Sequence, residues 1–170
     1  VGCALGEEVF SLAILLKEVG LLDRSYIYAS DISTDALAKA ESGILSRELD
    51  RSTIDRYRAC GGKYSLLEYF TTACGNCKLD ESILERIKFS NHDITQTSLA
   101  VKYHLVLCRN VLIYFNRELQ SRALNNILES MVKAGYLVIG PKESLEFSSF
   151  KNCFKTIDHS SRVYHRCGSN

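Results

Sequence analysis

The chain of 170 residues has no tryptophan and one proline, Pro141, and it has no repeats, low-complexity tracts or long linkers. Its apolar runs are short. Residues 12–16 form one of them, whereas a membrane-spanning helix needs about 20 apolar residues. The sequence therefore predicts no direct membrane insertion. Because 46% of the residues are apolar, we expect one domain with its own hydrophobic core.

An excess of either charge is also missing, since 21 lysines and arginines face 20 aspartates and glutamates, for a net charge of +1. A protein that follows a phosphate backbone usually carries a basic surface. The balance therefore argues against a nucleic-acid partner. It is typical of a neutral cytoplasmic domain.

Cysteine is plentiful, but the seven residues are odd in number and scattered from Cys3 to Cys167. This pattern does not resemble a disulfide framework. Cys74 and Cys77 have the spacing of a metal or redox pair, yet no second such pair and no nearby histidine pair would complete a zinc site. The sequence favours reduced, structurally neutral thiols and predicts no metal site, with zinc or redox chemistry as the alternative.

Strands and helices alternate along the chain, which predicts an α/β fold with a doubly wound, mostly parallel sheet and an antiparallel C-terminal hairpin. We expect helices at residues 8–19, 34–41, 52–59, 65–70 and 117–132, and strands at residues 26–29, 87–90, 104–108, 136–140, 154–157 and 162–165. Ser33 or Thr34 and Asn116 are candidate helix caps, and Gly135 is the expected end of the helix that Asn116 begins. Residues 44–86 form an irregular insert.

The first residues form a glycine turn of the kind that follows a buried strand. We therefore expect the chain to be a fragment, residues 1–170 of one domain, whose first strand is missing.

Three segments fall where ligands bind in such sheets, at the carboxyl ends of strands. The first is the turn from Gly2 to Gly6, which leads into a helix through Glu7 and Glu8. The second is Asp31, placed to accept hydrogen bonds from ribose hydroxyls. The third contains Asp93 and Ile94, which we expect near an adenine.

This pattern fits either a dinucleotide or S-adenosylmethionine. A dinucleotide needs its pyrophosphate at the N-terminus of the helix, where Glu7 and Glu8 would repel it. S-adenosylmethionine has no phosphate and carries an ammonium and a sulfonium, so acidic residues suit it better. Taken singly, Glu7 and Glu8 are ordinary first-turn residues, and Asp31 and Asp93 have equally ordinary interpretations as cap or turn residues.

Residues 108–115, CRNVLIYF, closely resemble the signature of CheR-type chemotaxis-receptor methyltransferases. The opening glycine turn, the segment around Asp31, the 136–140 strand, the run that begins at Glu143 and the closing Val163-Tyr164 also follow the order of that family. The resemblance covers essentially the whole chain. It implies a Rossmann-like class I methyltransferase fold.

The resemblance further implies methyl transfer from S-adenosylmethionine, leaving S-adenosylhomocysteine, to glutamate carboxylates of a methyl-accepting chemotaxis receptor or a related signalling protein. Carried over by position, the residues expected at the cofactor are Gly2, Gly6, Glu7, Asp31, Asp93, Ile94, Asn110 and Val111. Tyr114 is expected near the transferred methyl, as an orienter of the substrate carboxylate, and Arg109 is the second predicted catalytic residue.

The chain departs from the family in two places. A histidine-serine-glutamate run usually follows the 136–140 strand, where this chain has Gly140-Pro-Lys-Glu143. The insert at 44–86 reads as richer in helix than the small β-subdomain of the family, which argues against its gripping a receptor tail peptide. Two alternatives stay open, namely a non-catalytic sensor of adenosyl ligands and a methyltransferase with another acceptor.

Overall fold

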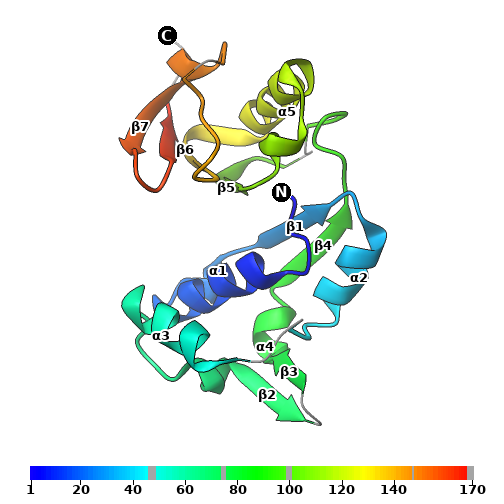
Figure 1. Ribbon diagram of the computed structural model, residues 1–170, viewed down its shortest axis with the longest axis vertical. Coiled ribbons are helices and arrows are strands. Elements are labelled where there is room, and N and C mark those ends of the chain that lie inside the picture. Colours follow the sequence, from blue (N-terminus) through cyan, green and yellow to red (C-terminus); the bar gives the residue numbers. More distant parts are fainter. Residues whose placement is uncertain (46–48, 74–75, 99–100, 147, 168–170) are drawn as a thin grey trace. The chain divides into compact units, whose positions relative to one another are not determined.

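The computed structural model describes residues 1–45, 49–73, 76–98, 101–146 and 148–167. The chain divides into two compact units. We call Cys3–Asn91 the first unit, and Val1–Gly2 together with His92–Asn170 the second unit. Figure 1 shows the elements of each.

The first unit carries two small sheets and most of the helices of Figure 1. Strand β1 (Ile27–Asp31) pairs in parallel with β4 (Ile87–Asn91), which sets Asp31 opposite Asn91. Strands β2 (Phe70–Ala73) and β3 (Asn76–Leu79) form an antiparallel hairpin. The helical segments are α1 (Glu7–Glu18), η1 (Leu22–Arg24), α2 (Thr34–Glu41), α3 (Arg51–Ala59), η2 (Leu66–Tyr69) and α4 (Glu81–Leu84).

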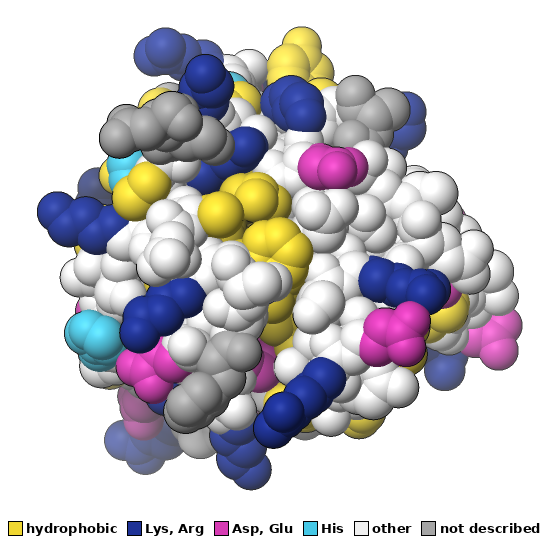
Figure 2. Space-filling view, turned by 90° about the horizontal axis from the view of Figure 1, so that it is seen from above, with side chains coloured by type: hydrophobic (Ala, Val, Ile, Leu, Met, Phe, Trp, Pro, Cys, Tyr) yellow, Lys and Arg dark blue, Asp and Glu magenta, His cyan; other side chains and the backbone are white. Residues whose placement is uncertain are grey.

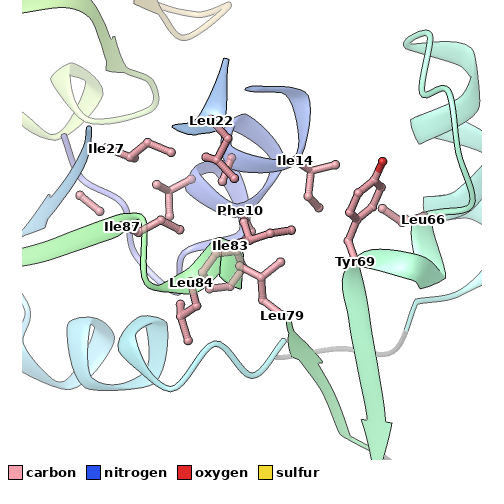
Figure 3. Packing of buried hydrophobic residues seen from close by; sticks show 13 residues of the cluster. Phe10, Ile14, Leu22, Ile27, Leu66, Tyr69, Leu79, Ile83, Leu84 and Ile87 are labelled. Carbon is pink, nitrogen blue, oxygen red and sulfur yellow. The ribbon is translucent and has the colours of Figure 1, made fainter. Parts of the chain in front are cut away.

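The core of the first unit joins α1 to the β1–β4 pair and to the insert (Figure 3). Phe10 and Ile14 of α1 pack into one buried cluster with Ile27 of β1 and Ile87 of β4. Leu79 and Ile83 extend this cluster, so the β2–β3 hairpin and α4 share the core of the first unit. Because apolar side chains lie on most sides of α1, the helix packs against several neighbouring elements of this unit.

The second unit is a four-stranded sheet of order β5-β6-β8-β7, with α5 (Arg117–Glu129) packed against it. Its strands are β5 (Tyr103–Cys108), β6 (Met131–Ile139), β7 (Phe154–Asp158) and β8 (Val163–Arg166), with short helices η3 (Leu112–Tyr114) and η4 (Lys151–Cys153). Strands β5 and β6 are parallel, whereas β6, β8 and β7 are antiparallel. The predicted α/β class and the antiparallel C-terminal hairpin are confirmed.

Two predicted helix starts are also confirmed. The Ser33 hydroxyl accepts a hydrogen bond from the N–H of Ala36 at 3.2 Å. The Asn116 side chain accepts one from the N–H of Leu119 at 3.0 Å. Each side chain satisfies a backbone donor that the first turn of a helix leaves without a partner.

The prediction that the last helix reaches residue 132 and ends at Gly135 is wrong. Helix α5 ends at Glu129, and β6 begins at Met131. The Arg166 guanidinium of β8 donates to the Leu128 carbonyl at 2.8 Å and also to that of Met131, and so caps the end of the helix. Gly135 lies inside β6 at a register shift, where a Cβ would come within 3.1–3.3 Å of three backbone carbonyl oxygens.

The predicted helix at residues 65–70 is also wrong. A single 3₁₀ turn occupies Leu66–Tyr69, and Phe70 begins β2. Because Cys77 and Leu79 alternate with exposed neighbours and point into the core, the hairpin is held by burial on one face. The insert at 44–86 therefore contains a β-hairpin. A high helix content of the insert is thus no longer an argument against its binding a receptor tail peptide. Of the Cys74/Cys77 pair, Cys74 lies outside the described residues, and Cys77 is a buried free thiol.

Within the ranges that the structure describes, no helix is both long and apolar enough to cross a bilayer. Over the same ranges, no group of three or more histidine, cysteine, aspartate or glutamate residues could hold a metal ion.

Candidate functional site

The turn before α1 is built from left-handed residues. Gly2 has φ +67°, Ala4 has φ +47° and Gly6 has φ +87°. In the first unit, the Cys3 N–H donates to the Ser30 carbonyl of β1 at 3.0 Å, and the Gly6 N–H closes the turn on the Cys3 carbonyl at 2.9 Å. Gly6 needs its lack of a side chain, because a Cβ there would lie 2.7 Å from the ring of Phe10. The turn is thus fixed against the end of β1.

Asp31 organises this end of the first unit. Its Oδ2 accepts the N–H of Ala4 at 2.8 Å, and its Oδ1 accepts the N–H of Ser33 at 2.9 Å. The Asn91 amide donates to the Asp31 and Ile32 carbonyls at 3.1 and 2.8 Å. Asp31 is only half-buried. A carboxylate can accept about four hydrogen bonds, so these contacts leave acceptor capacity on the open side.

Glu7 and Glu8 form the first turn of α1, directly after Gly6, and both are half-buried. Their charges lie at the positive end of the helix, where they interact favourably with its dipole and make the place unfavourable for a phosphate. The turn, Asp31 and these glutamates fit a ligand with ribose hydroxyls and a cationic end.

In the second unit, Gly2 packs directly on Val111. A Cβ at Gly2 would lie 2.4 Å from Cγ2 of Val111, so no other residue fits there without displacement. The backbone nitrogen of Val1 donates to the Leu107 carbonyl of β5 at 2.8 Å. The structure thereby brings together two of the predicted cofactor residues, Gly2 and Val111.

Asn110, another predicted cofactor residue of this unit, adopts a left-handed conformation with φ +58° just beyond β5. Its N–H donates to Oε2 of Glu143 at 3.1 Å, and the N–H of Ile113 donates to Oε1 at 3.3 Å. Glu143 is only 5% exposed. From the sequence, Glu143 had a place in the family order but no role, because two of its partners, the N–H groups of Asn110 and Ile113, lie 33 and 30 positions away.

The two predicted catalytic residues lie on the surface. Tyr114 is 81% exposed, and its backbone is fixed by the η3 turn, in which its N–H donates to the Val111 carbonyl at 3.2 Å. Arg109 is also exposed, directly before Asn110. Both side chains are therefore carried by the same short segment as Asn110 and Val111.

Asp93 and Ile94 have different surroundings. Both oxygens of Asp93 accept hydrogen bonds within one turn, from Thr95 at 2.7 Å and from the amide of Gln96 at 2.9 Å. The hydrogen bond from the Thr95 hydroxyl is the main reason that the pKa of Asp93 is lowered. Ile94 is 4% exposed and belongs to the core of the second unit. The structure thus shows a turn aspartate and a core isoleucine at these two positions.

Comparison with known proteins identifies the family. Residues 1–163 match the family described as the SAM-binding domain of the CheR methyltransferases. A methyltransferase named Cher3 from Pseudomonas putida is 43% identical over 165 residues, which is 97% of this chain and 60% of that protein. A chemotaxis protein methyltransferase of Vibrio cholerae is 31% identical over 146 residues, or 82% of this chain and 51% of that protein. The chain thus spans between half and two thirds of the length of these two relatives.

Among solved structures, the glycopeptide N-methyltransferase MtfA in complex with sinefungin is similar with a TM-score of 0.51 and 12% identity. The alignment covers 81% of this chain and 40% of MtfA. This likeness supports the class I methyltransferase fold.

Proposed function

Because the chain belongs to the CheR methyltransferase family as its S-adenosylmethionine-binding domain, we propose that it transfers methyl groups to glutamate side chains of chemotaxis receptors. The acceptor would be a methyl-accepting receptor or a related signalling protein. The family and the fold support the methyltransferase part of this proposal, and the named Vibrio relative supports its chemotaxis part.

The observation that carries the cofactor part of the proposal is the arrangement at the end of β1. Asp31 orders the glycine turn through Ala4 and still has acceptor capacity on its open side. In the first unit, Asp31 would accept hydrogen bonds from the ribose hydroxyls, and Glu7 would interact with the cationic end of the ligand. In the second unit, Asn110 and Val111 are further proposed cofactor residues, whereas Asp93 and Ile94 contribute mainly to their own turn and core.

The chemistry requires little of the protein. S-adenosylmethionine supplies an activated methyl group on a sulfonium. A glutamate side chain has an unperturbed pKa of ~4.3 and is already ionised at neutral pH, so no general base is needed. The protein must then hold the carboxylate in line and remove part of its water. The exposed Tyr114 hydroxyl and the Arg109 guanidinium can both donate to a carboxylate, and we assign them this orienting role.

Nucleic-acid acceptors fit less well. The net charge is +1, and on the face in Figure 2 the lysine and arginine side chains are spread out, with aspartate and glutamate side chains between them. A surface that follows phosphates would gather its basic residues.

The test uses the protein that contains this chain, S-adenosylmethionine with a labelled methyl group, and the helical cytoplasmic region of a chemotaxis receptor. We expect label on the receptor that alkali releases as methanol, because carboxyl methyl esters hydrolyse in base. A receptor whose glutamates are replaced by glutamine is the control and should remain unlabelled.

Two results would contradict the proposal. Base-stable label would indicate methylation of nitrogen or another acceptor atom. Tight binding of S-adenosylhomocysteine without any transfer would favour the alternative, a non-catalytic sensor of adenosyl ligands.

A further inference from the structure

The loop after β6 carries a buried carboxylate that the proposed chemistry does not use. Gly140 to Glu143 form a tight turn in which the Glu143 N–H donates to the Gly140 carbonyl at 3.0 Å. Pro141 occupies the second position of this turn, where its fixed φ is favourable. The turn directs the side chain of Glu143 back toward the ends of β5 and β6.

All the hydrogen bonds that the described residues donate to this carboxylate come from backbone N–H groups. They belong to Gly140, Asn110 and Ile113. A buried carboxylate is costly unless such donors satisfy it, and each bond to a charged acceptor is stronger than a neutral one. Glu143 therefore fixes the backbone at both ends of residues 110–113.

Gly140, directly after β6, is a glycine because the Glu143 carboxylate and the Asn110 backbone lie close to it. A Cβ on Gly140 would lie 2.7 Å from Oε2 of Glu143 and 2.9 Å from the N–H nitrogen of Asn110. The φ of Gly140 is not positive. The close approach of the Asn110 backbone and of the Glu143 carboxylate, and not a left-handed conformation, thus requires glycine here.

A second side chain holds the carbonyl groups of the same loop. The amide of Gln120 on α5 donates to the carbonyls of Leu112 and Phe115 at 3.0 and 3.1 Å. The segment is therefore held by an acceptor that binds its N–H groups and a donor that binds its carbonyls. Of the two, only Glu143 reaches Asn110, which adopts a left-handed conformation that asparagine tolerates better than most residues.

We propose that Glu143 is a positioning residue of the methyltransferase site, which sets the backbone of Asn110 and Val111 for the cofactor. This inference rests on the proposed function. The carboxylate touches neither cofactor nor acceptor and acts through the segment that it holds. The same segment carries Arg109 and Tyr114, so their placement depends on Glu143 as well.

The test compares Glu143→Gln with the wild type by calorimetric binding of S-adenosylhomocysteine and by hydrogen exchange of the amides at residues 110–113. Glutamine has the same size but brings an N–H₂ group toward backbone donors. We expect about tenfold weaker binding and faster exchange of the Asn110 and Ile113 amides. Gly140→Ala leaves Glu143 intact but crowds both its carboxylate and the Asn110 backbone, so it should change both measurements in the same direction.

Two control variants separate positioning from simple loss of stability. Glu146→Gln changes an exposed glutamate of the same loop and should leave both measurements unchanged. Ile127→Val lowers stability in the core of the same unit, and it should leave the affinity of the folded protein unchanged.

Wild-type affinity and slow amide exchange in folded Glu143→Gln would overturn this inference and leave the proposed function standing. Failure of the wild type to bind S-adenosylhomocysteine would instead refute the proposed function.

Discussion

Asp31 in the first unit and Glu143 in the second are carboxylates with similar partners and different surroundings. Each lies beyond or at the end of a strand and accepts the N–H of a left-handed residue, Ala4 for Asp31 and Asn110 for Glu143. Asp31 is half-buried, whereas Glu143 is 5% exposed. The difference between them is burial. The half-buried Asp31 can still accept hydrogen bonds from a ligand, whereas the buried Glu143 accepts them from the protein.

This difference shows why residue type and position along a strand do not identify a binding residue. Both carboxylates hold a turn, and a sequence pattern cannot show which of them keeps an open side. That depends on the atoms packed around each side chain. The comparison can be tested by changing one member at a time.

We expect the largest effect from Asp31→Ala, which removes the proposed ribose anchor and the hydrogen bond that holds the glycine turn through Ala4. The loss of two hydrogen bonds from the ribose hydroxyls to this charged acceptor predicts binding of S-adenosylhomocysteine weakened by about 100-fold or more in calorimetry. The control is Asp23→Ala, because the side chain of Asp23 is 87% exposed in a surface ion pair with Arg86. Unchanged binding in Asp31→Ala would remove Asp31 from the site.

The next effect concerns Gly2, which packs on the segment that Glu143 holds. Gly2→Ala combines a φ of +67° with a Cβ 2.4 Å from Val111. Gly20→Ala is a matched control, because Gly20 has φ +70° and nothing within 4 Å of its Cβ position. Chemical denaturation should show Gly2→Ala to be less stable than Gly20→Ala by about 1–3 kcal/mol. Equal stabilities of the two variants would mean that Val111 moves away from the added methyl group at little cost in free energy.

A third carboxylate, Glu18, extends the comparison to side-chain donors. Burial alone would raise the pKa of Glu18, but hydrogen bonds from the phenols of Tyr57 and Tyr69 and from the N–H of Lys63 outweigh it and lower the pKa. A lowered folded-state pKa stabilises the fold above the unfolded value of ~4.3. This contribution is lost as the pH falls through the folded-state pKa.

We therefore expect the free energy of unfolding to fall less between pH 7 and about pH 3 in Glu18→Gln than in the wild type, as measured by urea unfolding. Asp55→Asn is the control, because Asp55 is an exposed residue of α3. An acid dependence identical in Glu18→Gln and the wild type would show that the Tyr57–Tyr69 cluster does not favour the ionised carboxylate.

The smallest effect should come from Asp93→Asn. Both oxygens of Asp93 are engaged with Thr95 and Gln96, and asparagine can retain part of that turn. We expect binding of S-adenosylhomocysteine to weaken less than tenfold, again by calorimetry. A loss as large as that of Asp31→Ala would make Asp93 a direct ligand contact.

Local sequence signals predicted the regular parts of the fold well. Ser33 and Asn116 were identified as caps because capping depends on residues within one turn. The end of α5 was not predictable in this way, since the side chain that caps it, Arg166 of β8, lies 38 positions away from Leu128. The β2–β3 hairpin was missed for a similar reason, because its inward face becomes apparent only when Cys77 and Leu79 meet the core.

By itself, the sequence determined the alternation of strands and helices, the family, the glycine turn and the candidate residues Asp31, Asn110 and Val111. Only the tertiary structure decided what each candidate touches. It placed Ile94 in a core and Gly2 against Val111, and it made Glu143 the acceptor for Asn110. The physical reason is that burial and hydrogen-bond partners depend on residues distant in the chain, whereas turns and caps depend on near neighbours.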